Sequence, residues 1–352
     1  MSDYLPKWHR ELDIFHKIKP MIILEGNVLD SYQYPLEGSV LRLEQYLHYY
    51  FKDTGYQNIV FFDSIRGFYN TCEDGYLQGF ADLVEANVTE QQIRADFKGR
   101  NATAPNMVRS AITQSQQATV VVMNFASRYI TSPTHMEQSE IDSFTVLLQA
   151  SMDAKDVRTE HSILKNLVVI VANKVNDIPA WFYLDNPNVK NILLRTPSKE
   201  EREHLVKSAR FPSFFASDIY AEDAPYYQEH PKELEKIQDR FVGMTEGFSF
   251  TELNGLRRLA KNQRIRIRNL CDVVDLYKFG IRENPWNAID RASIRNAHVD
   301  FTRRVKGQDP AITKTLDVIK RAITGMSGLQ SSSTSSPLLA EHRASSNVTP
   351  SM

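Results

Sequence analysis

Two asparagines follow an apolar run in residues 167–182, which read LVVIVANKVNDIPAWF. The β-branched run predicts a buried strand that ends at Asn173, and Asn176 lies in the polar turn behind it. Ligands of open α/β sheets gather at the carboxyl ends of the strands, so these amides are candidates for contacting a ligand. Alternatively, they only satisfy backbone groups of a strand-end turn. Both interpretations remain open on the sequence.

Two other apolar runs also end in residues that could meet a ligand. Asp63 ends the run NIVFF, and as a lone carboxylate it is either a ligand contact or a turn and cap residue. Gly26 and Asn27 follow the run MIILE, and their backbone could meet an anion or an adenine ring. The alternative for these two residues is a tight turn without a ligand.

The elements that would position these residues are short apolar runs separated by segments with helical spacing. Gly55 is a plausible stop for the helical segment after the first run, and Ser139 or a near neighbour is a plausible cap for another. Strands that are apolar throughout and alternate with helices predict an α/β fold with a mostly parallel sheet between helices. The five expected strands lie in residues 21–26, 58–65, 119–125, 167–174 and 191–196.

After Pro197 the pattern changes, and no convincing strand follows. SKEEREHLVKSA begins with a serine cap and an acidic first turn, which predicts a helix. We expect helices up to residue 325, with breaks at FPSFF, at EDAPYYQEHP and at ENPW. The serine-rich end of the chain has little apolar content and predicts a disordered tail.

Composition excludes several classes of protein. The 42 basic and 43 acidic side chains give a net charge of -1, so no overall field attracts nucleic acid or anionic lipid. Cys72 and Cys271 form no CxxC pair, and the histidines form no HxxxH or HxH array, so we expect no disulfide framework and no metal site. The charged start lacks a signal peptide and no run could span a bilayer, which predicts a soluble cytoplasmic protein without a membrane partner.

With these elements in place, the chain resembles P-loop ATPases of the AAA+ class. LVVIVANKVNDIP is similar to the strand that ends in sensor 1, a polar residue that orients the attacking water near the γ-phosphate, and Asn173 takes that position. Residues 191–209 are similar to the fifth strand and the Pro and acidic helix start that follow it. FVGMTEGFSFTELNGLRRLA (241–260) resembles the small helical lid, in which Arg257 or Arg258 falls near the sensor 2 arginine.

Two catalytic signatures of that family are missing from the sequence. No GxxxxGK[ST] string occurs, and EGNVLDSYQYPLEGS follows the first strand instead. The Walker B strand should end in carboxylates that hold Mg²⁺, whereas TVVVMNFASRY offers the neutral Asn124. Losing the phosphate lysine and the metal carboxylate removes most of the electrostatic stabilisation of phosphoryl transfer, which argues against hydrolysis by this module.

The segment DFTRRVKGQDPAITKTLDVIKRAITGMSG (300–328) resembles the turn and helix that precede the Walker A loop in Clp-type unfoldases. The combined resemblance implies the first, degenerate module and the linker of a tandem AAA+ ATPase. It implies four parts, namely an AAA+-like α/β core in residues 1–200, a helical lid in 201–280, a linker in 281–330 and the serine-rich tail in 331–352.

Three functions remain open. The first is a degenerate AAA+ module that supports nucleotide-dependent assembly or protein remodelling with an active ATPase module, as a homo- or hetero-oligomer that could act on a protein substrate. The second is a non-enzymatic interaction or regulatory domain. The third is an ATPase with a non-standard site, and only this one would use Mg²⁺. Weak binding of ATP or ADP would involve Gly26, Asn27, Asp63, Asn124, Asn173, Arg257 and Arg258.

Other residues have two interpretations each. Trp181 is expected in the core or at a subunit contact, because large aromatic side chains contribute most when buried. Arg195 and Arg202 could reach a phosphate or a neighbouring subunit, or lie on a solvated helix face. The basic stretch 257–270 could be a nucleic-acid stripe, but its spacing and lack of aromatic residues favour an exposed helix face. We therefore expect no nucleic-acid partner.

Overall fold

A computed structural model describes residues 5–34, 40–73, 75–84, 94–99, 102–160, 162–280 and 291–324. The chain divides into two compact units, Met1–Val274 and Asp275–Met352. The first unit contains an α/β core and a set of helices that follows it, and the second contains the rest of the last of these helices and two further described helices.

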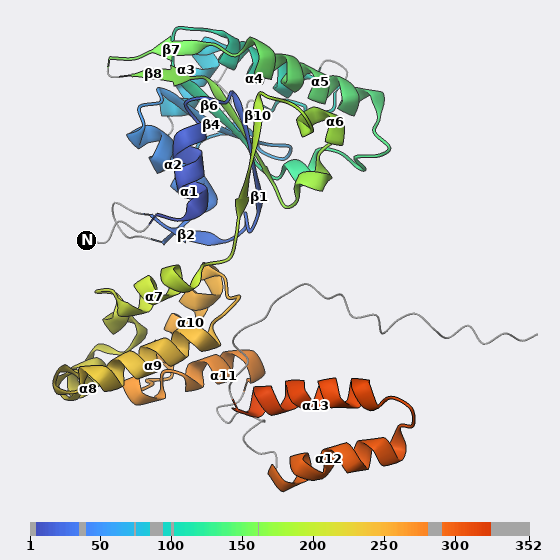
Figure 1. Cartoon of the computed structure of the whole chain (residues 1–352). Coiled ribbons are helices and arrows are strands. Elements are labelled where there is room, and N and C mark those ends of the chain that lie inside the picture. Colours follow the sequence, from blue (N-terminus) through green and yellow to red (C-terminus); the bar gives the residue numbers. More distant parts are fainter. Residues whose placement is uncertain are drawn as a thin grey trace, which may run out of the picture. The chain divides into compact units, whose positions relative to one another are not determined.

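A six-stranded sheet forms the α/β core (Figure 1). Its strand order is β10-β1-β9-β6-β4-β5, and each neighbouring pair is parallel except β4 with β5. All five expected runs form strands of this sheet. The sixth strand was not predicted, because it has only three residues and directly follows a tight turn. The strands are β1 (Met21–Gly26), β4 (Asn58–Asp63), β5 (Gly67–Tyr69), β6 (Thr119–Met123), β9 (Leu167–Ala172) and β10 (Val189–Leu194).

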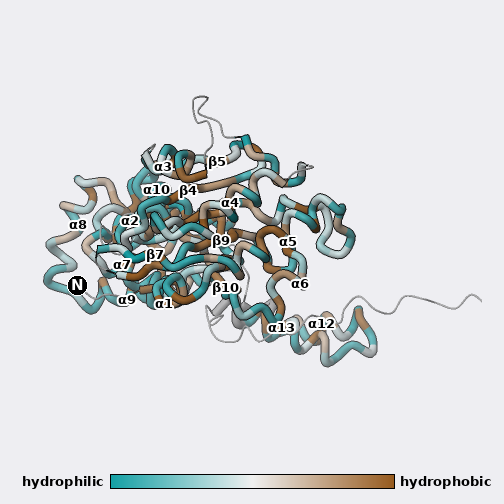
Figure 2. Tube along the Cα trace, turned by 90° about the horizontal axis from the view of Figure 1, so that it is seen from above, coloured by the Kyte–Doolittle hydropathy of each residue, from teal (hydrophilic) through white to brown (hydrophobic). Residues whose placement is uncertain are grey.

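Helices cover both faces of the sheet and bury two separate apolar cores (Figure 1). On one face lie α1 (Lys7–Phe15) and α2 (Leu43–Asp53), and on the other lie α3 (Gly75–Leu83), α4 (Thr103–Thr113), α5 (Gln138–Asp153) and α6 (Ala180–Tyr183). In Figure 2, β4 is among the hydrophobic segments between these helices. Side chains alternate between the two cores along each strand, so continuously apolar runs were the correct signal for strands.

Two β-hairpins lie outside the central sheet. One pairs β2 (Ser31–Gln33) with β3 (Val40–Arg42), and the other pairs β7 (Asp156–Arg158) with β8 (Ile163–Lys165). The segment predicted as one helix from Val40 onward therefore begins as a strand, because its first residues pair across the hairpin. The helix does stop before Gly55, which has a φ of +94°.

Helices follow the sheet, as the sequence predicts, and no strand occurs after Leu194 in the described residues. Phenylalanines and leucines such as Phe214, Phe241 and Leu253 give this helical part a core of its own. It consists of α7 (Lys199–Lys207), η3 (Phe211–Phe214), α8 (Ser217–Glu229), α9 (Pro231–Met244), α10 (Phe250–Asn262), η4 (Ile267–Asn269) and α11 (Asp272–Phe279).

The expected break at EDAPYYQEHP is confirmed at the end of that stretch, because α8 ends at Glu229 and α9 begins at Pro231. The helix α8 continues through the earlier proline of the stretch, Pro225. Contacts on both sides of the proline hold the helix. Tyr227 packs in the apolar core, and Asp223 pairs with Arg266 at 2.7 Å. Tertiary packing thus outweighs the lost backbone hydrogen bond of one internal proline.

The prediction of an exposed helix face over residues 257–270 is wrong for the second half of this stretch. The helix α10 ends at Asn262, and Arg264 has a φ of +50°. Two of the three arginines that follow are paired with acidic residues, because Arg264 pairs with Asp218 and Arg266 pairs with Glu222 of α8. This pairing does not favour a nucleic-acid stripe.

The second unit contains α12 (Arg291–Arg304) and α13 (Asp309–Thr324), which pack against each other. Gly307, with a φ of +73°, lies in the turn between them. Ile312 and Leu316 of α13 are buried. The turn that opens a helix after RVKGQ is therefore confirmed. The expected break at ENPW and the serine-rich tail lie outside the described residues.

Candidate functional site

The carboxyl ends of the parallel strands border a pocket of about 810 Å³. Its lining includes two acidic, two basic and three amide side chains, which are Asp30, Glu44, Arg42, Arg66, Gln45, Asn124 and Asn173. The sequence prediction named Asn124 and Asn173 from this set. It missed the four charged residues, because they lie in loops and helix starts without a strand-end signal.

The backbone N–H groups in the turn after β1 donate to backbone carbonyls of the turn itself and of the neighbouring strand ends. The fourth expected run does lie beside the first, since β9 pairs with β1, and Gly26 N donates to Asn173 O at 3.1 Å. Asn27 N donates to Leu194 O at 2.9 Å, and Val28 N donates to Gly26 O at 2.8 Å. Glycine is required at position 26, because its φ is +99° and a Cβ would lie 2.5 Å from Leu194 O.

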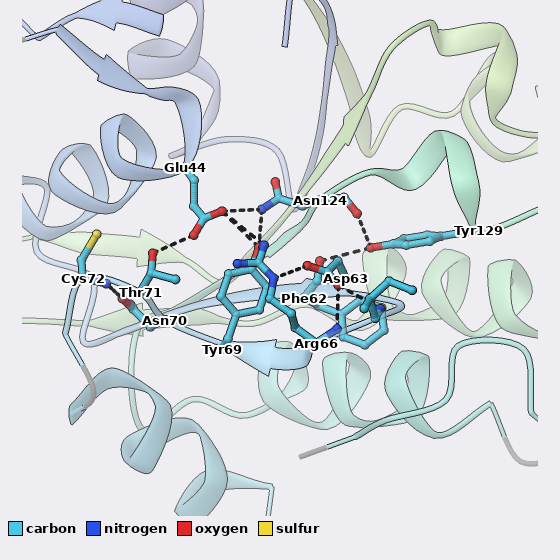
Figure 3. A network of polar contacts seen from close by, with 11 residues as sticks. Glu44, Phe62, Asp63, Arg66, Tyr69, Asn70, Thr71, Cys72, Asn124 and Tyr129 are labelled. Carbon is cyan, nitrogen blue, oxygen red and sulfur yellow. Dashed lines mark hydrogen bonds and ion pairs between the residues drawn. The ribbon is translucent and has the colours of Figure 1, made fainter. Parts of the chain in front are cut away.

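A carboxylate lies at the start of α2, on the wall of the pocket (Figure 3). Glu44 is in the first turn of this helix, where negative charge interacts favourably with the helix dipole. Its Oε1 accepts from Thr71 Oγ1 at 2.8 Å, and its Oε2 accepts from the Tyr69 hydroxyl at 3.2 Å. Arg66 Nη2 lies 3.5 Å from Oε2. Both carboxylate oxygens of Glu44 are therefore already engaged by the chain.

Asp63 lies at the end of β4 and acts as a turn residue. Its Oδ1 accepts from the backbone N of Ile65 at 2.9 Å and of Arg66 at 2.8 Å, and its Oδ2 accepts from Arg66 Nε at 2.6 Å. Burial alone would raise the pKa of this carboxyl, but the hydrogen bonds from Arg66 and Ile65 lower it below its usual value. The side chain does not line the pocket, whereas its partner Arg66 does.

Asn124 lies at the end of β6. In the family that the sequence resembles, a carboxylate that holds Mg²⁺ is expected at this position. The Nδ2 of Asn124 donates to the Tyr69 hydroxyl at 2.8 Å and to Glu44 Oε2 at 3.4 Å (Figure 3). The backbone carbonyl oxygen of Asn124 accepts from the Tyr129 hydroxyl at 2.7 Å. Burial raises the pKa of Tyr129 well above its ordinary value, so this hydroxyl stays protonated. Asn124 thus serves as a buried donor that connects β6 to Glu44.

A second carboxylate, Asp30, connects the loop after β1 to the helix α10. Its Oδ2 accepts from Phe250 N, and its Oδ1 accepts from Thr251 N, both at 2.8 Å. Thr251 Oγ1 also donates to Oδ1 at 2.6 Å, and Asn27 Nδ2 donates to Oδ2 at 2.8 Å. Asp30 is 4% exposed. A side chain of the core therefore caps a helix that begins 220 residues later in the chain.

Several predicted site residues lie outside the pocket lining. Arg257 is half-buried, with its Nη1 3.5 Å from Ser213 Oγ, and Arg258 is exposed. Gly26 and Asn27 contribute the turn below the pocket but no lining surface. Of the predicted site residues, the pocket lining thus contains Asn124 and Asn173, and the two arginines of α10 do not line it.

Four further candidates also have clear positions. Asn176 is exposed, and its Oδ1 accepts from the Tyr183 hydroxyl at 3.3 Å. Arg195 is exposed, which agrees with the solvated interpretation. Arg202 is buried and donates to Pro197 O at 2.8 Å, so a solvated helix face is wrong for this residue. Trp181 is 45% exposed, and its placement in the core is therefore also wrong.

Two other kinds of feature are absent from the described residues. Within the described part of the chain, no helix is long and apolar enough to cross a membrane. The same residues contain no group of three or more His, Cys, Asp or Glu side chains arranged to hold a metal ion.

Comparisons with known proteins place the chain in a family. Chains in three solved structures are similar to it. One belongs to the HORMA:CdnC:Trip13 complex of E. coli MS115-1, with 13% identity, a TM-score of 0.38, and coverage of 77% of this chain and 78% of that one. Another is Hsp104 in its closed state with ATPγS and FITC casein, with 12% identity, a TM-score of 0.38, and coverage of 91% and 48%.

The third is a DNA replication initiation factor, with 10% identity, a TM-score of 0.28, and coverage of 91% and 92%. No curated protein matches the sequence significantly. A family model described as the N-terminal Rossmann-like domain of AAA+ chaperones matches residues 2–194 of the 352, and this protein therefore belongs to that AAA+ chaperone family.

Proposed function

We propose that this chain is a catalytically inactive AAA+ module that supports nucleotide-dependent assembly and protein remodelling together with an active ATPase module. In this proposal residues 1–200 are the core, 201–280 the lid and 281–330 the linker. The observation that carries it is the Glu44 carboxylate at the start of α2, held by Thr71, Tyr69 and Arg66 on the wall of the strand-end pocket.

The triphosphate of a nucleotide does not fit the residues of this pocket. A phosphate cradle needs free backbone N–H groups and a lysine, whereas the N–H groups of Gly26, Asn27 and Val28 already have acceptors. The pocket lining within the described residues contains no lysine. Glu44 would repel a phosphate that approached the start of α2. These features support a module that binds ATP or ADP weakly or not at all.

A magnesium ion does not fit either, so we derive no catalytic step through one. Mg²⁺ requires several oxygen ligands in near-octahedral geometry. Both oxygens of Glu44 accept hydrogen bonds, Asp63 is engaged by Arg66 and Ile65, and Asn124 directs its Nδ2 toward Glu44. The third hypothesis, an ATPase with a non-standard site, is therefore not favoured.

A non-enzymatic interaction domain is the second candidate, and one surface supports it. Trp181 is 45% exposed and Leu184 is 58% exposed, at the start and just after the end of the short helix α6. Exposed aromatic side chains are enriched at protein interfaces. The first candidate function would use the same surface for assembly. The two candidate functions therefore differ in whether nucleotide that is bound by a partner module changes the association of this chain.

The test is to measure ATP turnover and molecular mass on the purified full chain. We expect turnover at the background rate, and a mass that rises with protein concentration. Trp181→Ala should weaken this association, whereas Met152→Ala, at another exposed apolar position, should not. Turnover that is lost in Asn173→Ala would contradict catalytic inactivity. A chain that stays monomeric with and without ATP would favour the second candidate.

A further inference from the structure

The start of α10 attracts negative charge for two reasons. The first N–H groups of any helix lack partners within that helix, and the helix dipole adds partial positive charge there. The helix's own cap, Ser249, accepts only from Glu252 N, at 3.2 Å. The N–H groups of Phe250 and Thr251 therefore need another acceptor, and a bound phosphate is one general solution to such a need.

In this chain the acceptor is Asp30, a residue of the core. Its carboxylate accepts from Phe250 N, Thr251 N and Thr251 Oγ1, and Asn27 Nδ2 holds it from the core side. The group is almost fully buried, with 4% exposure. Hydrogen bonds to an ionised buried acceptor are stronger than bonds between neutral groups. Asp30 thus provides the core side of a strong contact with the lid.

Another lid helix, α7, has the same type of cap. Ser198 and Glu201 form the capping box of α7, with Glu201 N donating to Ser198 Oγ at 3.2 Å and Ser198 N donating to Glu201 Oε2 at 2.7 Å. The capping box of α10, from Ser249 and Glu252, is complete as well. Because α10 already has its own cap, the contribution of Asp30 concerns the contact between lid and core.

We propose that Asp30 is an internal anion that fixes the lid helix α10 to the loop after β1, in place of a bound phosphate. The position of the lid relative to the core is then independent of nucleotide in this module. The module would present one constant surface to its partners, while conformational change is left to the active module. This inference rests on one part of the proposed function, namely that the pocket does not bind ATP.

The proposal can be tested by spin-label distance measurements on the full chain. Cys72→Ser and Cys271→Ala remove the native thiols, and labels are attached at Lys155→Cys in the core and Lys236→Cys in the lid, both at exposed positions. We expect a single narrow distance distribution that does not change when ATP and Mg²⁺ are added. Asp30→Ala should broaden this distribution about twofold, because the lid can then open locally.

Ser249→Ala is the matched control, because it removes the cap of α10 and leaves the contact with Asp30 in place. It should keep the narrow distribution. Equal widths for Asp30→Ala and the parent protein would overturn the proposal, and so would narrowing of the parent distribution by ATP. ATP turnover by the parent protein with an unchanged distribution would instead contradict only the proposed function.

Hydrogen exchange keeps the proposal testable if Asp30→Ala fails to fold. In the unsubstituted chain without nucleotide, the amides of Phe250 and Thr251 should exchange about tenfold more slowly than those of a free helix start. Asp30→Asn, which preserves the shape of the side chain, should reduce this protection and leave the strands β1 and β6 unaffected. Exchange of both amides at the rate of a free helix start would overturn the proposal.

Discussion

The helices α7 and α10 begin in the same way but differ in what they join. Each starts at a serine and has a glutamate three residues later, Ser198 with Glu201 and Ser249 with Glu252, and each pair forms a complete capping box. At the start of α10, an additional carboxylate, Asp30, comes from a distant part of the chain. A capping box thus defines where a helix begins, whereas a buried long-range acceptor makes that helix start part of a tertiary contact.

The largest effect should come from Asp30→Ala. The substitution leaves the N–H group of Phe250 without its acceptor in a buried place and that of Thr251 in a partly buried one, and each unsatisfied buried group costs about 1–3 kcal/mol. We expect the free energy of unfolding to fall by about 3 kcal/mol, as measured by chemical denaturation. Asp156→Ala, on the exposed carboxylate paired with Lys165, is the control and should cost less than about 1 kcal/mol. Similar losses for both variants would contradict the comparison.

The comparison extends to the core, because the carboxylate of Glu44 lies at the start of α2 as that of Asp30 lies at the start of α10. Glu44→Gln keeps the size of the side chain but removes the charge that faces Arg66 and the helix dipole. We expect a loss of about 1.5 kcal/mol in the free energy of unfolding, reduced at high salt because part of it is electrostatic. Denaturation at low and high ionic strength measures this. A loss that does not depend on salt would argue for a steric role instead.

Removing the two serine caps should have equal and smaller effects. Ser198→Ala and Ser249→Ala each delete one acceptor at a helix start, which typically costs about 1 kcal/mol. Both variants are compared by thermal and chemical denaturation. If Ser249→Ala cost as much as Asp30→Ala, the distinction between a local cap and a long-range contact would be wrong.

The smallest effect concerns pH and the capping box of α7. Burial raises the pKa of the Glu201 carboxyl above its usual value of 4.5. Because the folded state then binds the proton more readily, this group contributes stability below pH 4.5 that is lost as the pH rises through the raised pKa. Glu201→Gln should remove this pH dependence and raise the stability slightly at neutral pH. The measurement is the free energy of unfolding of both proteins from below pH 4.5 to neutral pH. If the parent protein gained stability relative to Glu201→Gln as the pH rose, the assignment would be contradicted.

The sheet could be predicted because its signals are local. Runs such as residues 167–172 are apolar throughout, and in the structure they form strands buried on both faces. Ser198 was identified as a cap because a serine followed by acidic residues is a local pattern as well. The strand β5 and the hairpin of β2 with β3 escaped prediction, because strands of three residues carry too few positions to show a period.

The charged part of the site could not be predicted for a different reason. Asp30 and Glu44 gain their roles from partners that are distant in sequence, such as Thr251 and Asn124. No spacing in the chain identifies such pairs. The exposure of Trp181 was missed in the same way, because composition suggests burial for a large aromatic residue but does not reveal which face of a short helix it occupies.

The central claim is that this AAA+ module has replaced phosphate contacts by its own carboxylates. The most direct test is a thermal unfolding titration of the full chain with ATP and Mg²⁺. We predict no saturable rise in Tm, because a ligand at 100 times its Kd would stabilise the folded state by about 2.7 kcal/mol and would be easily seen. A saturable rise that disappears in Asn173→Ala would place a nucleotide in the strand-end pocket and contradict the claim.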